Sequence, residues 1–447
     1  MSAATTAASA MPAQRTGAPR ADAETPLAVD GGRLWASLMA LARIGATEKG
    51  GVCRLALTDL DRQGRDCFVA WAKAAGCEIR VDRIGNLFAR RVGTDPSRAA
   101  VATGSHIDTQ PTGGKFDGNF GVLAGLEVVR TLNDAGIRTR APIEVCVWTN
   151  EEGSRFVPVM MGSGVYAGAF TLAHALAATD RDGLSVAAEL EAIGFAGDAP
   201  ASIADGAPRF DAYFEAHIEQ GPVLEDAGIV IGAVTGALGQ RWYDVTVTGQ
   251  EAHAGPTPMR LRRDALLVAS GLIARVNAIA LAEQPHGRGT VGCVDVHPNS
   301  RNVIPGRVSF TVDFRHGDDA GLARMDAALR QAIDDVAVAS GGGVVAAAKQ
   351  VVRFPPVAFD PVLVEAIRAA AHRLGEVPLD IVSGAGHDAV HVAATAPVAM
   401  IFVPCRNGIS HNEIEDAEPA HLTAGANVLL QAMLARAGVA SEPAAAG

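Results

Sequence analysis

The sequence predicts an α/β domain that is interrupted by a smaller, inserted α+β domain. Strand-like and helix-like segments alternate from about residue 34 to 235, as in α/β domains with a mostly parallel sheet. Near residue 238 the element order changes to β-α-β-β-α-β, the ferredoxin-like signature. After Pro355 and Pro356 the chain returns to α/β material. A length of 447 residues also exceeds what one hydrophobic core usually supports.

The first α/β segment reveals its elements through the spacing of apolar residues. Residues 143–148 (IEVCVW) carry β-branched side chains at alternate positions, which predicts a strand. Residues 121–132 place five apolar side chains on one face, which predicts a helix. Further short strands are expected at 100–103, 212–215 and 398–403.

The inserted segment is expected to contain four strands and two helices. These are a strand at 243–248, a helix at 263–282, strands at 290–296 and 307–314 separated by a Pro305-Gly306 turn, a helix at 320–339 and a strand at 343–350. The predicted division of the chain is a disordered tail (1–30), two catalytic-domain segments (31–237 and 355–436) around the inserted domain (238–354), and a flexible tail (437–447).

Composition narrows the class of partner. The formal net charge of −11 argues against nucleic acid or an anionic membrane surface, because both require basic patches. No apolar run is expected to reach the roughly 18 residues of a membrane span. The six cysteines form no CxxC pair, which indicates reduced thiols and a cytoplasmic protein.

Potential metal ligands follow four of the predicted strands. In open α/β sheets the functional site lies at the carboxyl ends of the strands, so these side chains are expected to converge. Asp117 adds a further ligand between a Gly113-Gly114 turn and the start of a helix. In strand order, the four positions are His106, the pair Glu151-Glu152, His217 and His411.

This donor set predicts two metal ions per chain. Imidazole nitrogens and carboxylate oxygens suit Zn²⁺, and also Mn²⁺ or Co²⁺. Five ligands exceed the three that one catalytic zinc needs, so one carboxylate is expected to bridge two ions. Asp117 is the expected bridge. Asp108, two residues after His106, is expected to orient that imidazole through its carboxylate.

Simpler interpretations apply to each residue taken singly. A lone loop histidine is more often solvated or structural than a ligand, and Glu151-Glu152 alone resembles an ordinary surface charge pair. The case for a metal site rests on the shared position after strands. Seven other histidines lack that setting and are assigned to structure: His174, His286, His297, His316, His372, His391 and His421.

Several motifs resemble those of a known enzyme family. They are GSHIDTQPTGGKFDGNFGVLAGLE, WTNEEGSRF, EAHIEQGP, GQEAHAGPTPM, NVIPG, SGAGHDA and GISHNEIED, in this order along the chain. The sequence is similar over roughly residues 35 to 435 to the N-carbamoyl-L-amino-acid hydrolases. This group includes the bacterial and fungal type of β-ureidopropionase and allantoate amidohydrolase, and it is related to the aminoacylase-like dizinc peptidases.

The resemblance implies specific roles for the quoted positions. The five metal ligands are the five residues named above, with Asp117 bridging, and Glu151 is the general base. The positions that match substrate contacts are Gln220, His253, Asn302, Arg315, Gly386 and His387. His253 is also expected to take part in catalysis by stabilising the oxyanion.

The resemblance further implies a dizinc-peptidase-like catalytic domain whose inserted domain is a lid that also forms a homodimer. His253 would then reach into the partner subunit's site. The implied reaction converts an N-carbamoyl amino acid into the free amino acid, ammonia and carbon dioxide. A hydroxide held by two metal ions would attack, and Glu151 would carry its proton to the departing amine.

The substrate within this group stays open at this point. Gly164 lies where several relatives carry a basic residue, which favours a carbamoyl α- or β-amino acid over allantoate. Allantoate hydrolysis and a dipeptidase- or aminoacylase-like activity are the alternatives among enzymes. A metal-bearing binding protein without catalysis is a more remote alternative, because such a protein has no physical need for Glu151 beside its ligand.

Overall fold

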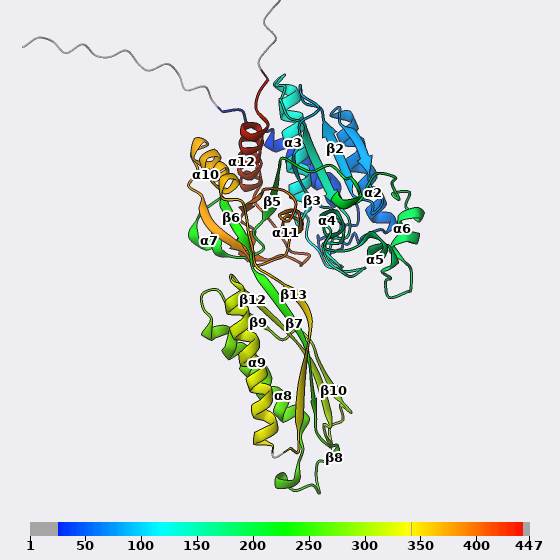
Figure 1. Cartoon of the computed structure of the whole chain (residues 1–447), viewed down its shortest axis with the longest axis vertical. Coiled ribbons are helices and arrows are strands. Elements are labelled where there is room, and N and C mark those ends of the chain that lie inside the picture. The colour runs from blue at the N-terminus through cyan, green and yellow to red at the C-terminus, as the bar shows by residue number, and fades with distance from the viewer. Residues whose placement is uncertain (1–25, 341, 441–447) are drawn as a thin grey trace, which may run out of the picture.

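The computed structural model describes residues 26–340 and 342–440. Figure 1 shows two lobes along the long axis, joined where β6 leads into β7 and where β13 returns. We call them the large lobe, which holds both ends of the described part of the chain, and the small lobe, residues 239–354. Each lobe has its own cluster of buried apolar side chains.

The large lobe is built on a nine-stranded mixed sheet with the order β1-β2-β4-β3-β5-β16-β6-β14, in which β15 also pairs with β6. Its four central strands, β4, β3, β5 and β16, are parallel neighbours. Their carboxyl ends therefore meet at one edge of the sheet. The strands are β1 (Glu78–Val81), β2 (Leu87–Arg91), β3 (Val101–His106), β4 (Ile143–Trp148), β5 (Ala212–Ile218), β6 (Gly232–Ala237), β14 (Val357–Ala358), β15 (Leu379–Ser383) and β16 (Val398–Val403).

Helices pack on this sheet in two groups. The helices α1, α3, α10 and α12 contact one another, and α4 contacts α11. Both groups reach the central strands, which are completely buried. The helices of the large lobe are α1 (Gly31–Ala42), α2 (Asp59–Ala74), α3 (Asn119–Asp134), α4 (Met161–Ala167), α5 (Leu172–Ala177), α6 (Val186–Ala192), α7 (Val223–Ala227), α10 (Pro361–Arg373), α11 (Asp388–Val392) and α12 (Pro419–Ala437).

The small lobe is an antiparallel sheet with two helices. Its strand order is β10-β12-β7-β13, with β9 also paired to β12, and a separate β8–β11 pair lies at its far end (Figure 1). Along the chain its main elements follow the order β-α-β-β-α-β. The elements are β7 (Gly239–Thr248), β8 (Ala252–His253), α8 (Ala265–Ala282), β9 (Arg288–Thr290), β10 (Val294–His297), β11 (Val303–Ile304), β12 (Arg307–His316), α9 (Asp319–Ala339) and β13 (Val345–Phe354).

Alternation of side chains explains how the small lobe builds a core from one sheet. Along β12 the even-numbered residues from Val308 to His316 are buried, whereas the intervening residues are partly exposed. The buried face packs against α8 and α9, whose long apolar stripes cover it. The other face of the sheet is left uncovered by helices of this lobe.

Two predictions about chain ends and elements need correction. The expected strand at 290–296 is divided into β9 and β10, with Gly292 between them, because glycine weakens a strand interior. The tails are shorter than expected: Leu27 O accepts Gln431 Nε2 at 2.6 Å, and Ala440 N donates to Arg138 O at 2.8 Å. The remaining predicted tail residues, 1–25 and 441–447, lie outside the described residues.

The expectation about membrane-length segments also needs correction. Within the described ranges, α8 is long and apolar enough to cross a membrane by length and composition. Polar residues such as Arg275 interrupt its apolar runs, so a search for contiguous apolar residues passes over it. One side of α8, including Leu272 and Val276, packs into the core of the small lobe. Leu267 and Leu281 remain exposed.

Candidate functional site

The parallel strands bring the predicted ligands to one place. His106 is the last residue of β3, and His217 lies just before the end of β5. Glu151 and Glu152 follow β4, and His411 follows β16 through a loop. The two histidines of β3 and β5 therefore stand inside their strands rather than after them, which shifts both predicted strand ends. In the structure these side chains converge at the carboxyl edge of the sheet, as expected.

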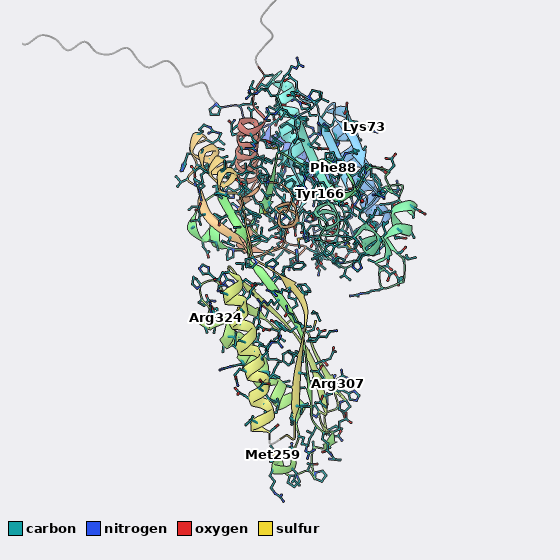
Figure 2. The ribbon with its side chains drawn as sticks, in the orientation of Figure 1. Lys73, Phe88, Tyr166, Met259, Arg307 and Arg324 are labelled. Carbon is teal, nitrogen blue, oxygen red and sulfur yellow. The ribbon has the colours of Figure 1, made fainter. Side chains whose placement is uncertain are left out.

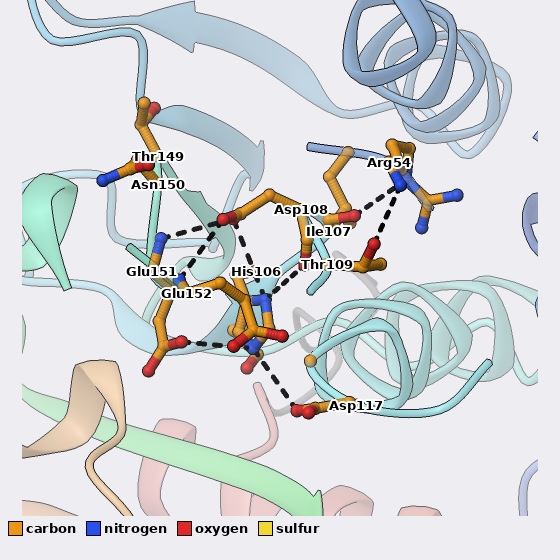
Figure 3. Close-up of polar contacts among 12 residues, drawn as sticks. Arg54, His106, Ile107, Asp108, Thr109, Asp117, Thr149, Asn150, Glu151 and Glu152 are labelled. Atoms are coloured by element: carbon orange, nitrogen blue, oxygen red, sulfur yellow. Dashed lines mark hydrogen bonds and ion pairs between the residues drawn. The ribbon is translucent and has the colours of Figure 1, made fainter. Parts of the chain in front are cut away.

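Asp117 lies just before α3 and contacts three histidines of this cluster, of which Figure 3 shows the contact with His106. Its Oδ1 lies 3.2 Å from His217 Nε2 and 3.6 Å from His106 Nε2. Its Oδ2 lies 3.3 Å from His411 Nε2. The two oxygens thus face different ligands. Such a carboxylate can contribute one oxygen to each of two neighbouring ions.

Hydrogen bonds set which nitrogen of two histidines is free. His106 Nδ1 lies 2.9 Å from the main-chain oxygen of Asp108, and His217 Nδ1 lies 2.8 Å from that of Ile218. A carbonyl only accepts, so both Nδ1 atoms carry the hydrogen and both Nε2 lone pairs face Asp117. Gly118 N also donates to His217 Nε2 at 3.2 Å. The tautomer with its hydrogen on Nδ1 is the one that a histidine needs to bind a metal ion through Nε2.

The role expected for Asp108 changes in one respect. Its carbonyl, rather than its carboxylate, is the close partner of His106, because the carboxylate oxygen stands 3.8 Å from Nδ1. The carboxylate instead accepts the main-chain N–H groups of Glu151 and Glu152, each at 3.3 Å (Figure 3). Asp108 therefore fixes the backbone that carries the two glutamates.

The adjacent glutamates take different positions. Glu152 Oε2 lies 3.3 Å from His411 Nε2, and Gln110 donates to both of its oxygens, at 3.1 and 2.7 Å. Glu151 Oε2 lies 3.6 Å from His106 Nε2, and its side chain faces the cavity described below. Glu152 is thus held among the ligand atoms, while Glu151 keeps a freer carboxylate beside them.

The electrostatics of the cluster favour a bound cation. Burial raises the pKa of Glu152 to about 7, and burial also raises the pKa of Glu151 well above its usual value. Buried carboxylates that repel one another are stabilised by positive charge among them.

Three groups of side chains could each hold a metal ion. The group of Glu215, His217 and His387 shares His217 with one of the other two. Of these other two, one is His106, Asp117 and His217, and the other is Asp117, Glu152 and His411, with the ligand atoms of each group within 4.8 Å of one another. Asp117 belongs to both groups. The donors are nitrogen and oxygen atoms of the kind that bind zinc and neighbouring divalent metals. The site is therefore compatible with two metal ions.

Gly118 shows how tightly the backbone follows this cluster. Its φ is +65°, in the left-handed region, and a Cβ there would collide with the imidazole of His106. A glycine satisfies both conditions. The close approach of the backbone lets Gly118 N reach His217 and starts α3 beside the ligands.

A cavity of about 240 Å³ lies against the cluster and extends to the small lobe. Gln220, Gly386 and His387 line it, as expected for substrate contacts. Gln220 Nε2 donates to Asp117 Oδ2 at 3.0 Å, and His387 Nε2 lies 2.9 Å from Ser383 Oγ. Both side chains are therefore anchored in the large lobe next to the ligands.

Arg315 reaches the same cavity from β12 of the small lobe. Its Nη1 donates to the carbonyl of Gly384 at 2.7 Å, which joins the two lobes at this point. Its Nε and Nη2 donate to Asp313 Oδ2 at 3.1 and 2.9 Å. Asp313 is the acidic neighbour of Arg315; Asp318, which follows β12, pairs with His316 instead.

His253 and Asn302 lie elsewhere in the chain. His253 is on β8, at the far end of the small lobe near Met259 and Arg307 (Figures 1 and 2). Asn302 is beside it, because Ala254 N donates to Asn302 O at 2.8 Å. Both are exposed and neither lines the cavity. The expected substrate contacts of His253 and Asn302 are therefore not made in the cavity of their own chain.

Sequence reasoning missed several residues at the site. Glu415 is buried and accepts the N–H groups of Phe116 and Asp117 at 2.9 and 3.1 Å, so it fixes the backbone at the bridging carboxylate. Ser410 donates to Asp117 Oδ2 at 3.2 Å. Both belong to the GISHNEIED segment, where a serine and an acid beside His411 were the available signal. Gln240 and Trp242 line the cavity from β7.

Comparisons with known proteins agree with this geometry. The family model described as peptidase family M20/M25/M40 matches residues 102–435. The chain belongs to this family. It is 48% identical to an N-carbamoyl-L-amino-acid amidohydrolase from Rhizobium meliloti, over 91% of this chain and 96% of that protein. An allantoate amidohydrolase from Bacillus subtilis is 35% identical, over 87% of this chain and 93% of that protein.

Solved structures show the same relationship for this M20-family chain. A crystal structure of an amidase of the hydantoinase/carbamoylase family from Burkholderia multivorans is 60% identical, with a TM-score of 0.87. The match covers 92% of this chain and 98% of that one. The resemblance carried by the sequence motifs is therefore confirmed.

Proposed function

We propose that the protein hydrolyses N-carbamoyl amino acids to the free amino acid, ammonia and carbon dioxide. The observation that carries this proposal is the cavity of about 240 Å³ that joins a two-metal ligand cluster to Arg315. A cavity of this size suits a small substrate. Its two ends offer a place for a hydrolysable carbonyl and a guanidinium for a carboxylate. The relatives named amidohydrolases support the same substrate class.

Five residues would hold two divalent metal ions: His106, Asp117, Glu152, His217 and His411. Zinc is the ion we propose, with manganese or cobalt as alternatives. When bound, the ions would polarise the carbamoyl carbonyl and lower the pKa of a water molecule. Glu151 would accept a proton from that water and deliver it to the departing amine. Its position in the cavity, 3.6 Å from His106 Nε2 but outside both ligand groups, supports this division of roles.

Substrate orientation would fall to residues on both lobes. A guanidinium presents a planar fork that matches a carboxylate, and Arg315 is held in a defined orientation by Asp313 and Gly384. Gln220 and His387 would contact the ureido end, since both lie next to the metal ligands. Gly386 would give the substrate room beside Met160, whose Cε is 3.1 Å from the place of a Cβ.

We further propose that the small lobe is a lid that also forms a homodimer, with His253 and Asn302 serving the partner's site. Their exposed place at the far end of the lobe supports a role outside their own chain. A second argument is the groove of about 410 Å³ between α8 and α9, lined by Leu267, Val268 and Val336 among others. Exposed apolar surface of this kind marks association sites.

The six cysteines are free thiols, which supports a cytoplasmic location.

Allantoate is the second candidate substrate, because an allantoate amidohydrolase is among the relatives. The structure does not support the argument from Gly164 against allantoate. A Cβ at this glycine would point at Phe170 and towards His391, and Gly164 does not line the cavity. The choice between the two substrates therefore falls to experiment.

The deciding measurement is ammonia release from N-carbamoyl amino acids and allantoate, and release of free amino acids from a dipeptide, with Zn²⁺, Mn²⁺ or Co²⁺ added. We expect turnover of N-carbamoyl amino acids with at least one of these ions. Glu151→Gln protein serves as the control for contaminating activity. Faster turnover of allantoate would reassign the substrate, and metal binding without turnover of any compound would indicate a binding protein.

A further inference from the structure

Two residues of β7 share the cavity wall with Arg315. In the antiparallel pairing of β7 with β12, Gln240 lies directly opposite Arg315, and Trp242 lies opposite Asp313. Directly opposed residues point to the same face of a sheet, and so do residues two apart on one strand. All four side chains therefore share one face, and Gln240, Trp242 and Arg315 line the cavity from it.

Gln240 and Trp242 carry buried polar atoms that have no partner among the described residues. Gln240 is 7% exposed, and its Oε1 is buried without a hydrogen bond. The indole Nε1 of Trp242 is likewise buried without a partner. Twelve buried side-chain atoms lack a hydrogen-bond partner among the described residues, and of these only the atoms of Gln240 and Trp242 belong to residues that line this cavity, where a ligand would satisfy them.

Arg315 does not satisfy either group. Its guanidinium donates to Asp313 and to the carbonyl of Gly384. Gln240 offers an amide with both an acceptor and donors, whichever way it is turned, and the indole offers one donor. The cavity wall also includes apolar side chains such as Val159 and Met160. The polar recognition on this side of the cavity is therefore concentrated at Gln240 and Trp242.

We propose that Gln240 and Trp242 form the subsite for the substituent on the substrate carbon that carries the carboxylate, and that they select a short polar substituent, above all a carboxamide. This proposal rests on the proposed function. With the ureido group at the metal ligands and the carboxylate at Arg315, the substituent lies between them, beside β7. A carboxamide can pair with the Gln240 amide and accept from the Trp242 indole.

Size adds to this selection. The whole cavity measures about 240 Å³, and the indole of Trp242 forms part of its wall. A phenylalanine or tryptophan substituent would have to displace that ring. Trp242 therefore has two effects: its N–H favours a polar substituent, and its bulk excludes a large one.

The test compares kcat/KM for four substrates: N-carbamoylglycine and the N-carbamoyl derivatives of L-asparagine, L-leucine and L-phenylalanine. Asparagine and leucine side chains have nearly the same size and branching, so their ratio reports the polarity of the subsite rather than its shape. We expect the asparagine compound to exceed the leucine compound at least about tenfold. Gln240→Leu should bring that ratio close to one. Trp242→Phe should lower the ratio, and Trp242→Ala should raise kcat/KM for the phenylalanine compound.

Glycine carries no substituent, so kcat/KM for N-carbamoylglycine measures any general effect of each variant, and the values for the other compounds are compared with it. Tyr243→Phe is the matched control, because Tyr243 lies on the opposite face of β7 and donates to Asp326 at 2.8 Å. It should leave the asparagine-to-leucine ratio unchanged. A ratio that stays high in Gln240→Leu, or a wild-type protein that prefers leucine, would overturn the subsite.

Equilibrium binding separates failure of the subsite from failure of the proposed function. Metal-loaded Glu151→Gln protein should bind the asparagine compound more tightly than the leucine compound, and adding Gln240→Leu should remove the difference. If no carbamoyl compound is hydrolysed by the wild type, the proposed function fails, and these affinities alone decide on the subsite. Equal affinities for both compounds would reject it.

Discussion

Glu151 and Glu152 are consecutive in the chain, yet their carboxylates face different histidines. Glu151 Oε2 lies 3.6 Å from His106 Nε2, whereas Glu152 Oε2 lies 3.3 Å from His411 Nε2. Both main-chain N–H groups donate to Asp108, so one carboxylate fixes the pair. The two side chains can therefore diverge from a rigid backbone, one beside His106 and the other beside His411, and both line the cavity.

This divergence predicts separable effects of two equivalent substitutions. Glu151→Gln should keep both metal ions and lose activity by about 10²–10⁴-fold, because proton transfer by a positioned base contributes that much. Glu152→Gln should weaken one metal site, since an amide oxygen is a poorer ligand than a carboxylate. Metal content by elemental analysis, together with ammonia release, checks both. Loss of an ion from Glu151→Gln but not from Glu152→Gln would exchange the two roles.

The convergence of the proposed metal ligands could be predicted from the sequence because it depends on local order. A polar side chain at the end of a strand lies at the carboxyl edge of the sheet. Parallel pairing of the strands then brings His106, His217 and the Glu151-Glu152 pair together. Asp117 was placed by its position before a helix. The β-α-β-β-α-β order of the small lobe follows from apolar periodicity in the same way.

The remaining site residues depend on contacts that no local pattern reveals. Glu415 reaches the backbone of Asp117 from a distant part of the chain. His106 contacts the carbonyl of Asp108 rather than its carboxylate, because the carboxylate accepts the main-chain N–H groups of Glu151 and Glu152. Gln240 and Trp242 gain their place only through the register of β7 with β12. Asn302 lies away from the cavity of its own chain because it is at the far end of the long small lobe.

Arg315 is expected to anchor the substrate carboxylate. Arg315→Lys should raise KM for an N-carbamoyl amino acid at least about tenfold with both metals bound, because lysine cannot present a bidentate fork. The amide of the same substrate should be a poor substrate for the wild type, but the variant should discriminate less between acid and amide. Steady-state kinetics of both proteins with both compounds form a double cycle.

Arg324→Lys is the matched control for this cycle. Arg324 pairs with Glu283 on the surface of the small lobe, at 2.7 Å, and lies outside the cavity (Figure 2). Its replacement should leave both KM values unchanged. Additive effects of Arg315→Lys and of the substrate amide would show that the arginine and the carboxylate do not interact.

His391 predicts a pH dependence of stability that is independent of the metal site. Burial lowers its pKa from 6.5 to about 4, and its Nε2 is buried without a partner among the described residues, beside Phe170 and Phe354. Below pH 6.5 the unfolded chain takes up a proton that the folded chain refuses. The free energy of unfolding should therefore fall as the pH drops from about 6.5 to 4, by at most about 3 kcal/mol from this group.

Urea midpoints of wild type and His391→Phe at pH 7 and pH 5 measure this contribution. The variant should lose less stability than the wild type over that interval. His372→Gln controls for removing a histidine, because His372 is exposed on α10. An equal loss in wild type and His391→Phe would show that His391 is not the group that titrates.

The position of His253 predicts complementation between subunits. His253→Ala and Glu151→Gln should each be nearly inactive as homodimers. In an equal mixture, half of the dimers are hybrids, and each hybrid has one site with an intact Glu151 and an intact His253 from the neighbouring chain. Dissociating and re-forming the mixture should therefore restore about a quarter of wild-type activity.

Mixing His253→Ala with a double Glu151→Gln, His253→Ala variant provides the control, since no site then has both residues. Hybrids identified by differential tagging but without activity would place the action of His253 within its own chain or outside catalysis. Because His253 is exposed on β8 and lies outside the cavity of its own chain, recovery of activity would identify the small lobe as the part that completes the neighbouring site.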